Sequence, residues 1–246
     1  MKELELVVLS LRYSSWSIRP WLALQHAGAE FQTRTVVLPH LGMQKQAGAV
    51  LVPDTQNESL SERRATGSVT GLYPVLYVGG SPVHEALAIC EWAAEAFPGA
   101  GLWPDDMMER ALARSLSCEM ATGFGSLRQT MSCHVFARVP DFVPDENTTT
   151  DITRIFEIWS DCLQRSGGPF LFGRFSVVDC MYFPVVTRFE TYGIELPVAL
   201  EDYRSSLFEL PAVRAWAELA KTAPPVPIYD EHIRSLGGGP TAAMPV

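Results

Sequence analysis

Strand-like segments are confined to the first third of this chain, and that asymmetry constrains its fold more than any other feature. Residues 4–9 read Leu-Glu-Leu-Val-Val-Leu, a short apolar run with β-branched residues that predicts a buried strand. Alternation and turn signals predict three more strands, over residues 31–38, 73–78 and 81–83. Gly79 and Gly80 separate the last two and predict a tight hairpin turn.

Two helices are predicted among these strands. Residues 18–27 have helical spacing, with Ser17 as the expected N-cap, Pro20 in the first turn and Gly28 at the C-terminal stop. A second helix is predicted over residues 85–97. Residues 1–98 are therefore expected to fold as an α/β domain in the order β-α-β, a long and partly helical connection, then β-β-α.

The remainder of the chain carries few strand signals. Apolar spacing predicts helices over residues 106–138, 148–164, 177–192 and 212–220. We expect residues 99–235 to form an all-helical domain. The glycine- and proline-containing residues 236–246 are expected to be a disordered tail.

Composition limits the classes of function. Asp and Glu number 28 against 19 Lys and Arg, a formal net charge of −9, which excludes a chain-wide basic surface for nucleic acid. The chain has no apolar run of about 18 residues, so no membrane contact is expected. Its 5 cysteines lack CxxC spacing and its 5 histidines lack HExxH spacing, so no metal site is expected. The opening residues do not resemble a secretory signal, and we expect a cytoplasmic protein.

Four segments, in order along the chain, resemble motifs of the cytosolic glutathione S-transferases. Residues 13–20 (Tyr-Ser-Ser-Trp-Ser-Ile-Arg-Pro) are similar to the catalytic turn of serine-type bacterial members. Residues 68–76 are similar to the segment S-P-T-G-x-V-P-V-L, and residues 84–91 to x-E-S-x-A-I-x-x-Y. Residues 175–179 are similar to the family's S-x-x-D capping box. The resemblance spans about residues 4–222. It implies a thioredoxin-like first domain, a helical second domain, glutathione as co-substrate and a homodimer.

Two serines are the candidate catalytic residues. A thiol has a reference pKa of about 8.5, so a transferase must stabilise the thiolate of glutathione. A hydroxyl at a helix N-terminus can donate to that sulfur, aided by the helix dipole. The family pattern places the active hydroxyl about five residues before a helical arginine, here Arg19, which makes Ser14 the first choice and Ser15 the second. The alternative is that both serines only cap the helix, the interpretation favoured for Ser17. Arg19 itself is expected in a structural ion pair.

The resemblance also implies the contacts with glutathione. It implies that Tyr73–Pro74 is a cis peptide and that the backbone of Tyr73 pairs with the cysteinyl part. Glu85 matches the family's acidic residue for the γ-glutamyl group, whereas Ala86 lacks the usual serine hydroxyl. Leu72 replaces a commonly basic residue. Trp16 is expected beside glutathione.

The second substrate is expected between the two domains. Tyr13 is a candidate on the near side, and the far wall has five candidates on the predicted long helix: Met120, Phe124, Arg128, Met131 and His134. The same helical spacing is typical of core residues. The sequence therefore does not decide whether these candidates line the substrate site or pack in the core. Residues 119–124 resemble a bacterial E-M-H-S-G-F stretch, with Ala121 and Thr122 replacing His and Ser.

The leading functional hypothesis is a glutathione S-transferase that conjugates a small hydrophobic electrophile. A glutathione-dependent isomerase of the maleylacetoacetate type is the first alternative. There glutathione would add and leave again, so that no conjugate accumulates. A non-catalytic binding or scaffold protein of the same fold is the second alternative, and Ala86 and Leu72 favour it. The sequence does not identify the electrophile.

Overall fold

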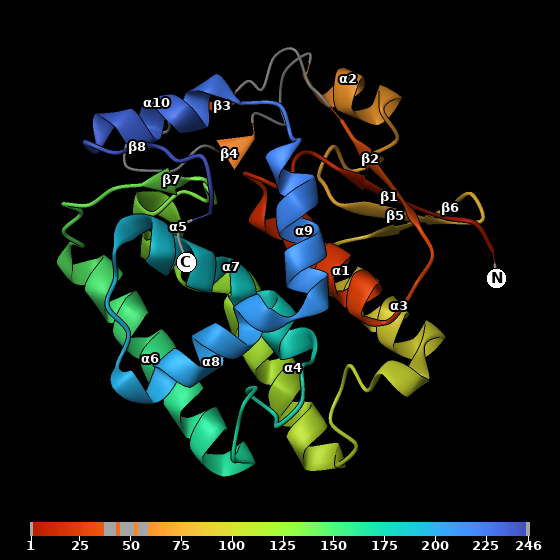
Figure 1. Ribbon diagram of the computed structural model, residues 1–246. Helices are drawn as coiled ribbons and strands as arrows, with labels where there is room; N and C mark the ends of the chain where they lie inside the picture. The colour runs from red at the N-terminus through yellow and green to blue at the C-terminus, as the bar shows by residue number, and fades with distance from the viewer. Residues whose placement is uncertain (1, 37–42, 45–51, 54–58, 245–246) are drawn as a thin grey trace.

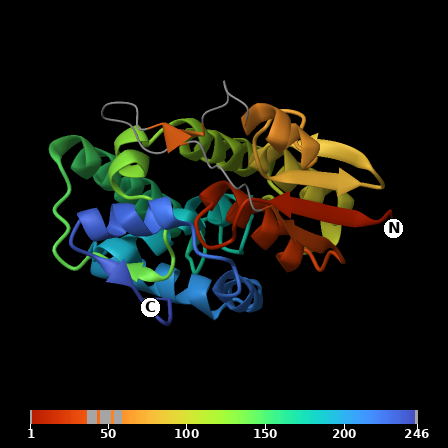
Figure 2. The same cartoon turned by 90° about the horizontal axis from the view of Figure 1, so that it is seen from above.

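The computed structural model describes residues 2–36, 43–44, 52–53 and 59–244. Figure 1 shows a sheet with its helices beside a larger group of helices, and Figure 2 shows the same two parts from above. Four strands form the sheet in the order β2-β1-β5-β6. Their bounds are Gln32–Thr35 for β2, Leu4–Val8 for β1, Val75–Val78 for β5 and Ser81–His84 for β6.

The sheet is mixed, because β1 pairs parallel with β2 and antiparallel with β5, and β5 pairs antiparallel with β6. The predicted succession of elements along the chain, β-α-β and then β-β-α, and the glycine hairpin are confirmed. Residues 37 and 38 of the predicted second strand lie outside the described residues. Between β2 and β5, Met43–Gln44 (β3) pairs with Val52–Pro53 (β4), and helix α2 covers Ser59–Ala65.

Two helices of the first part pack side by side: α1 (Ser15–His26) and α3 (Ala86–Ala96). A short 3-10 helix, η1 (Pro98–Ala100), follows α3. The chain then forms α4 (Met107–Thr122), α5 (Gly125–Thr130), α6 (Glu146–Ser166), α7 (Val177–Tyr192), α8 (Val198–Glu209), α9 (Pro211–Lys221) and α10 (Pro227–Ser235). The expected domain boundary at residue 98 falls within η1 and stays a prediction.

The prediction of one helix over residues 106–138 is wrong. Gly123 ends α4, and a Cβ at this position would lie 2.8 Å from the carbonyl oxygen of Glu119. Phe124 then adopts a left-handed backbone with φ 58°, which a continuous α-helix does not allow. After α5 the chain leaves helical geometry and forms the short strand β7 (Ala137–Arg138).

The prediction of a disordered tail is also wrong for the residues described, which extend to 244. Strand β8 (Gly239–Pro240) pairs antiparallel with β7. Gly238 allows this approach, since a Cβ there would lie 2.4 Å from the carbonyl oxygen of Arg138. Backbone pairing that joins residues so distant in sequence leaves no local pattern, so composition alone suggested a flexible end.

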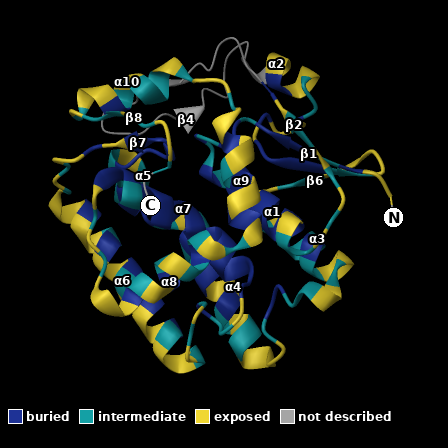
Figure 3. Cartoon of the chain, viewed as in Figure 1, coloured by how far each residue is buried: buried dark blue, intermediate teal, exposed yellow. Residues whose placement is uncertain are grey.

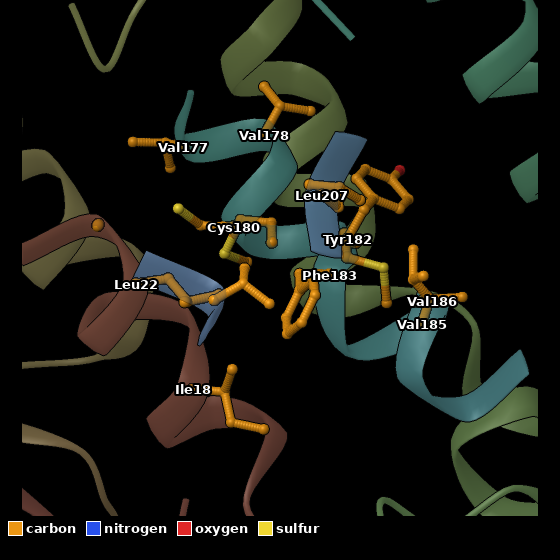
Figure 4. Packing of buried hydrophobic residues seen from close by; sticks show 14 of the residues in the cluster. Ile18, Leu22, Val177, Val178, Cys180, Tyr182, Phe183, Val185, Val186 and Leu207 are labelled. Carbon is orange, nitrogen blue, oxygen red and sulfur yellow. The ribbon is translucent and has the colours of Figure 1, made fainter. Parts of the chain in front are cut away.

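Helix α7 is the centre of the helical part. It is buried on all sides, as Figure 3 shows, which is expected of a helix whose apolar residues surround its axis. The predicted capping box at its start is confirmed, with Ser176 and Asp179 bonding each other's backbone. Ile18 and Leu22 of α1 belong to the same hydrophobic cluster as α7, as Figure 4 shows, so the two parts of the chain share one core.

Candidate functional site

Strand register brings three predicted segments to one end of the sheet. Val7, near the end of β1, pairs with Val75 at the start of β5, and Val75 pairs with His84 at the end of β6. The turn that follows β1, the Tyr73–Pro74 peptide before β5 and the start of α3 after β6 therefore lie at the same edge. Segments that are 60 to 70 residues apart in the sequence meet there because of the antiparallel pairing.

Ser14 is the N-cap of α1. Its Oγ accepts hydrogen bonds from the backbone N–H of Ser17 at 3.3 Å and from the Ser17 hydroxyl at 2.9 Å. The expectation that Ser17 caps this helix is therefore wrong, and Pro20 lies in the helix interior instead of the first turn. Because Ser14 Oγ accepts both bonds, its own hydrogen remains available to a ligand.

Ser15 is the first residue of α1 and points to a different environment. Its side chain is buried, and its Oγ lies 3.5 Å from Nη2 of Arg188 on α7. Ser14 is only half-buried. The geometry therefore favours Ser14 over Ser15 as the hydroxyl that a ligand can reach.

The Tyr73–Pro74 peptide bond is cis, as predicted. The Tyr73 hydroxyl donates to the carbonyl of Arg63 at 3.1 Å and also contacts Thr66 Oγ1. In the part of the chain that the structure describes, no hydrogen bond occupies the backbone N–H or C=O of Tyr73. Both groups can therefore pair with an extended peptide laid along this edge.

Glu85 has a strained backbone at the start of α3. Its φ is 70° and its ψ 141°, a region that residues other than glycine rarely adopt. The Glu85 side chain is exposed, whereas Ala86, the first helical residue, is buried. The free N–H groups of this helix end suit an anionic group. Strain of this kind concentrates at functional sites, which agrees with the role predicted for Glu85.

Tyr13 is committed to contacts within the protein. It is 3% exposed, and its hydroxyl donates to Oδ1 of Asp230 on α10 at 3.0 Å. The same carboxylate oxygen lies 2.8 Å from Nε2 of His134, and the Tyr13 ring stacks on Tyr229 at 5.1 Å. Burial raises the pKa of Tyr13 to about 12, so the hydroxyl stays protonated at neutral pH. These contacts favour an anchoring role for Tyr13 over direct contact with the second substrate.

Sequence reasoning missed Asp230, and it placed His134 on the wall of the second-substrate site instead of beside Asp230. Asp230 lies 217 residues from Tyr13, and neither residue belongs to a recognisable motif. These contacts tie α10 to the turn before α1.

Trp16 is half-buried, with two guanidinium groups over its ring. The guanidinium carbon of Arg19 lies 4.3 Å from the ring centroid, and that of Arg128 lies 5.1 Å away. Arg19 is fully buried and donates from Nε to the carbonyl of Met181 at 3.0 Å. Among the described residues it forms no ion pair, so the expected one is not present.

The other wall candidates divide between core and surface. Met120, Phe124 and Met131 are buried members of the main hydrophobic cluster, which favours packing over ligand contact. Arg128 is half-buried, and its Nε donates to the carbonyl of Gly123 at 3.1 Å. It is the least buried of the wall candidates.

The described ranges hold neither a metal-ligand cluster nor a membrane-spanning helix. No group of three or more His, Cys, Asp or Glu side chains there could hold a metal ion. No helix there is long and apolar enough to cross a membrane.

The mixed four-stranded sheet with α1 and α3 is a thioredoxin-like unit, and a helical part follows it along the chain. Sequence models give the family. The glutathione S-transferase N-terminal domain matches residues 13–96, and the glutathione S-transferase C-terminal domain matches residues 146–219. The chain belongs to the glutathione S-transferase family.

Individual relatives are distant. A probable maleylacetoacetate isomerase of Caenorhabditis elegans is 29% identical over 113 residues, which cover 46% of this chain and 44% of that protein. The chain thus matches less than half the length of this curated relative.

Solved structures share the fold. A glutathione transferase homologue from Burkholderia strain BGR1, solved with bound glutathione, has a TM-score of 0.65 and 20% identity over 89% of this chain and 99% of its own. A Tau class glutathione S-transferase from mango, Mangifera indica, has a TM-score of 0.61 and 18% identity over 89% and 96%.

Proposed function

We propose that this protein is a glutathione transferase in which the hydroxyl of Ser14 donates a hydrogen bond to the thiolate of glutathione. The observation that carries this proposal is the geometry of the cap. Ser14 Oγ accepts from both the amide and the hydroxyl of Ser17, so its own hydrogen is free to point out of the helix end. A charge-assisted hydrogen bond and the positive end of the α1 dipole would both favour the thiolate.

The chemical step follows from a stabilised thiolate. Glutathione gives its thiol proton to solvent on binding, and the sulfur then attacks an electrophilic carbon. A C–S bond forms, and either the leaving group departs with its bonding pair or, in an addition, the adjacent carbon takes a proton from water. In this scheme Ser14 keeps its own proton and contributes a hydrogen bond.

The remaining contacts with glutathione are assigned to the same edge of the sheet. The free backbone N–H and C=O of Tyr73 would pair with the cysteinyl part, and Trp16 would lie beside it. Glu85 and the N–H groups at the start of α3 would hold the γ-glutamyl amine and carboxylate. The bound glutathione of the Burkholderia homologue supports this assignment of ligand.

Calorimetry with glutathione tests the proposed site. Ala86→Ser restores the hydroxyl that the family motif carries at the start of α3, and we expect it to tighten binding about fivefold, as one added hydrogen bond to a carboxylate would. Ala88→Ser is the matched control, because Ala88 is exposed on the same helix and should leave the affinity unchanged. No binding by wild type and by Ala86→Ser at millimolar glutathione would contradict the proposal and favour a non-catalytic role.

A second candidate is a glutathione-dependent isomerase, favoured by the match to the nematode protein. Its hallmark would be turnover without net consumption of glutathione.

A homodimer and a cytoplasmic location stay predictions. Size-exclusion chromatography with light scattering tests the homodimer.

A further inference from the structure

Three arginines from different elements surround the start of α1. Arg19 lies on α1, Arg128 on α5 and Arg188 on α7. Arg19 and Arg128 both lie over the Trp16 ring, and Nη2 of Arg188 lies 3.5 Å from Ser15 Oγ. We call these three side chains the arginine cluster. Through its contacts with Trp16 and Ser15, the cluster adjoins the start of α1.

The arginine cluster has no balancing negative charge among the described residues. None of its members forms an ion pair there; the hydrogen bonds of Arg19 and Arg128 go to backbone carbonyls, and those of Arg188 go to backbone carbonyls and to Ser15. Burial lowers the pKa of Arg128 and the charge of Asp151 opposes that shift, but the two residues form no ion pair, and Asp151 Oδ2 accepts from the backbone N–H of Leu127. The chain carries a surplus of acidic residues, yet none of those that the structure describes forms an ion pair with this cluster.

The neighbouring thiols do not supply the missing charge. Burial raises the pKa of Cys133, and it raises the pKa of Cys90 to about 12, so both are neutral at physiological pH. Arg19 is fully buried, and its Nη1 and Nη2 have no hydrogen-bond partner among the described residues. Burial, together with the charges of Arg128 and Arg188, lowers the pKa of Arg19 well below its usual value. Uncompensated buried charge is costly, and a bound anion would relieve the cost.

Arg128 is the least buried member of the cluster. Its Nε and Nη2 are held by the carbonyls of Gly123 and Met120, which fixes the plane of the guanidinium. The side chain is half-buried, and Nη1 has no hydrogen bond within the described residues. A fixed planar donor beside an aromatic ring suits a carboxylate attached to an apolar group.

We propose that the arginine cluster is a subsite for the carboxylate of the second substrate, so that the preferred electrophile is an anionic conjugated acid. This inference rests on the proposed function. It places the carboxylate at Arg128 Nη1, in the positive field of Arg19 and Arg188, with the reactive carbon toward Ser14.

The test compares 3-benzoylacrylate with its methyl ester, two acceptors that share the reactive alkene and differ in charge. Wild type should show the higher kcat/KM for the acid. In Arg128→Met the ratio of acid to ester should fall about tenfold, as the loss of one charge-assisted hydrogen bond predicts, and Arg128→Lys should recover part of it. Arg154→Met is the matched control, since Arg154 pairs with Glu119 on the exposed side of α6 and should not change the ratio.

A binding measurement separates this inference from the proposed chemistry. Calorimetry with 3-benzoylpropionate, the saturated and unreactive acid, should show binding to wild type that weakens about tenfold in Arg128→Met. An equal acid-to-ester ratio in wild type and Arg128→Met, or equal binding of the saturated acid, would overturn the subsite. Turnover of neither acceptor by wild type, with the saturated acid still bound through Arg128, would instead contradict the transferase function alone.

Discussion

Ser14→Ala is expected to lower kcat/KM for conjugation about 10- to 100-fold, the range for one lost hydrogen bond to a charged group. The Ser14 hydroxyl is the available donor at the N-terminus of α1, because its Oγ already accepts from Ser17. Without it the thiolate loses that bond while the helix dipole remains. The measurement is steady-state turnover with saturating glutathione and a simple electrophile.

The same substitution also removes a helix cap, and that effect has to be separated from catalysis. Loss of an N-cap hydroxyl costs about 1 kcal/mol, so Ser14→Ala should melt a few degrees lower and stay folded at assay temperature. Ser14→Thr keeps both a cap acceptor and a hydroxyl donor and should retain most of the turnover. Ser15→Ala should lose less than Ser14→Ala, since Ser15 Oγ is buried toward Arg188. A larger loss in Ser15→Ala would reassign the donor.

Asp179→Ala is expected to be the most destabilising single substitution among those considered, by about 3 kcal/mol. The Asp179 carboxyl is fully buried and accepts from the backbone N–H of Leu171 at 3.1 Å and from the N–H and hydroxyl of Ser176 at 2.8 and 2.9 Å. Alanine would leave these buried donors unsatisfied at the start of the central helix α7. For a chain of this size we expect a drop in Tm of about 6–12 °C.

Asp145→Ala is the control for a helix cap without burial. Asp145 caps α6 and accepts from the backbone N–H of Thr148 at 2.7 Å, but it is exposed to solvent, so water can replace the lost bond. Its effect on Tm should be clearly smaller than that of Asp179→Ala. Equal shifts in the two variants would show that burial at Asp179 contributes nothing beyond an ordinary cap.

Local patterns predicted the elements that local physics determines. The apolar strand at residues 4–8, the hairpin glycines and the S-x-x-D box at Ser176 each specify a short structure, and each is found. The motif around Tyr73–Pro74 predicted a cis peptide, and it is present. The capping residue of α1 was harder to predict, because Ser14, Ser15 and Ser17 offer the same hydroxyl chemistry within four positions. Only the backbone geometry assigns the cap to Ser14.

Long-range contacts were beyond the reach of sequence patterns. The pairing of β8 with β7 and the bond from Tyr13 to Asp230 depend on the path of the whole chain. The break at Gly123 and Phe124 was missed because the apolar spacing continues across it. The arginine cluster was also missed, since its members come from three helices and a buried arginine without a carboxylate has no local pattern.

The most direct test of the central claim is the pKa of the glutathione thiol when bound to the protein. Titration of the thiolate ultraviolet absorbance, with free glutathione as the reference, measures it. The free thiol has a pKa of about 8.5, and stabilisation by Ser14 and the α1 dipole should lower it by at least about one unit. Ser14→Ala should return most of that shift. A bound thiol with the pKa of free glutathione in both proteins would contradict the account.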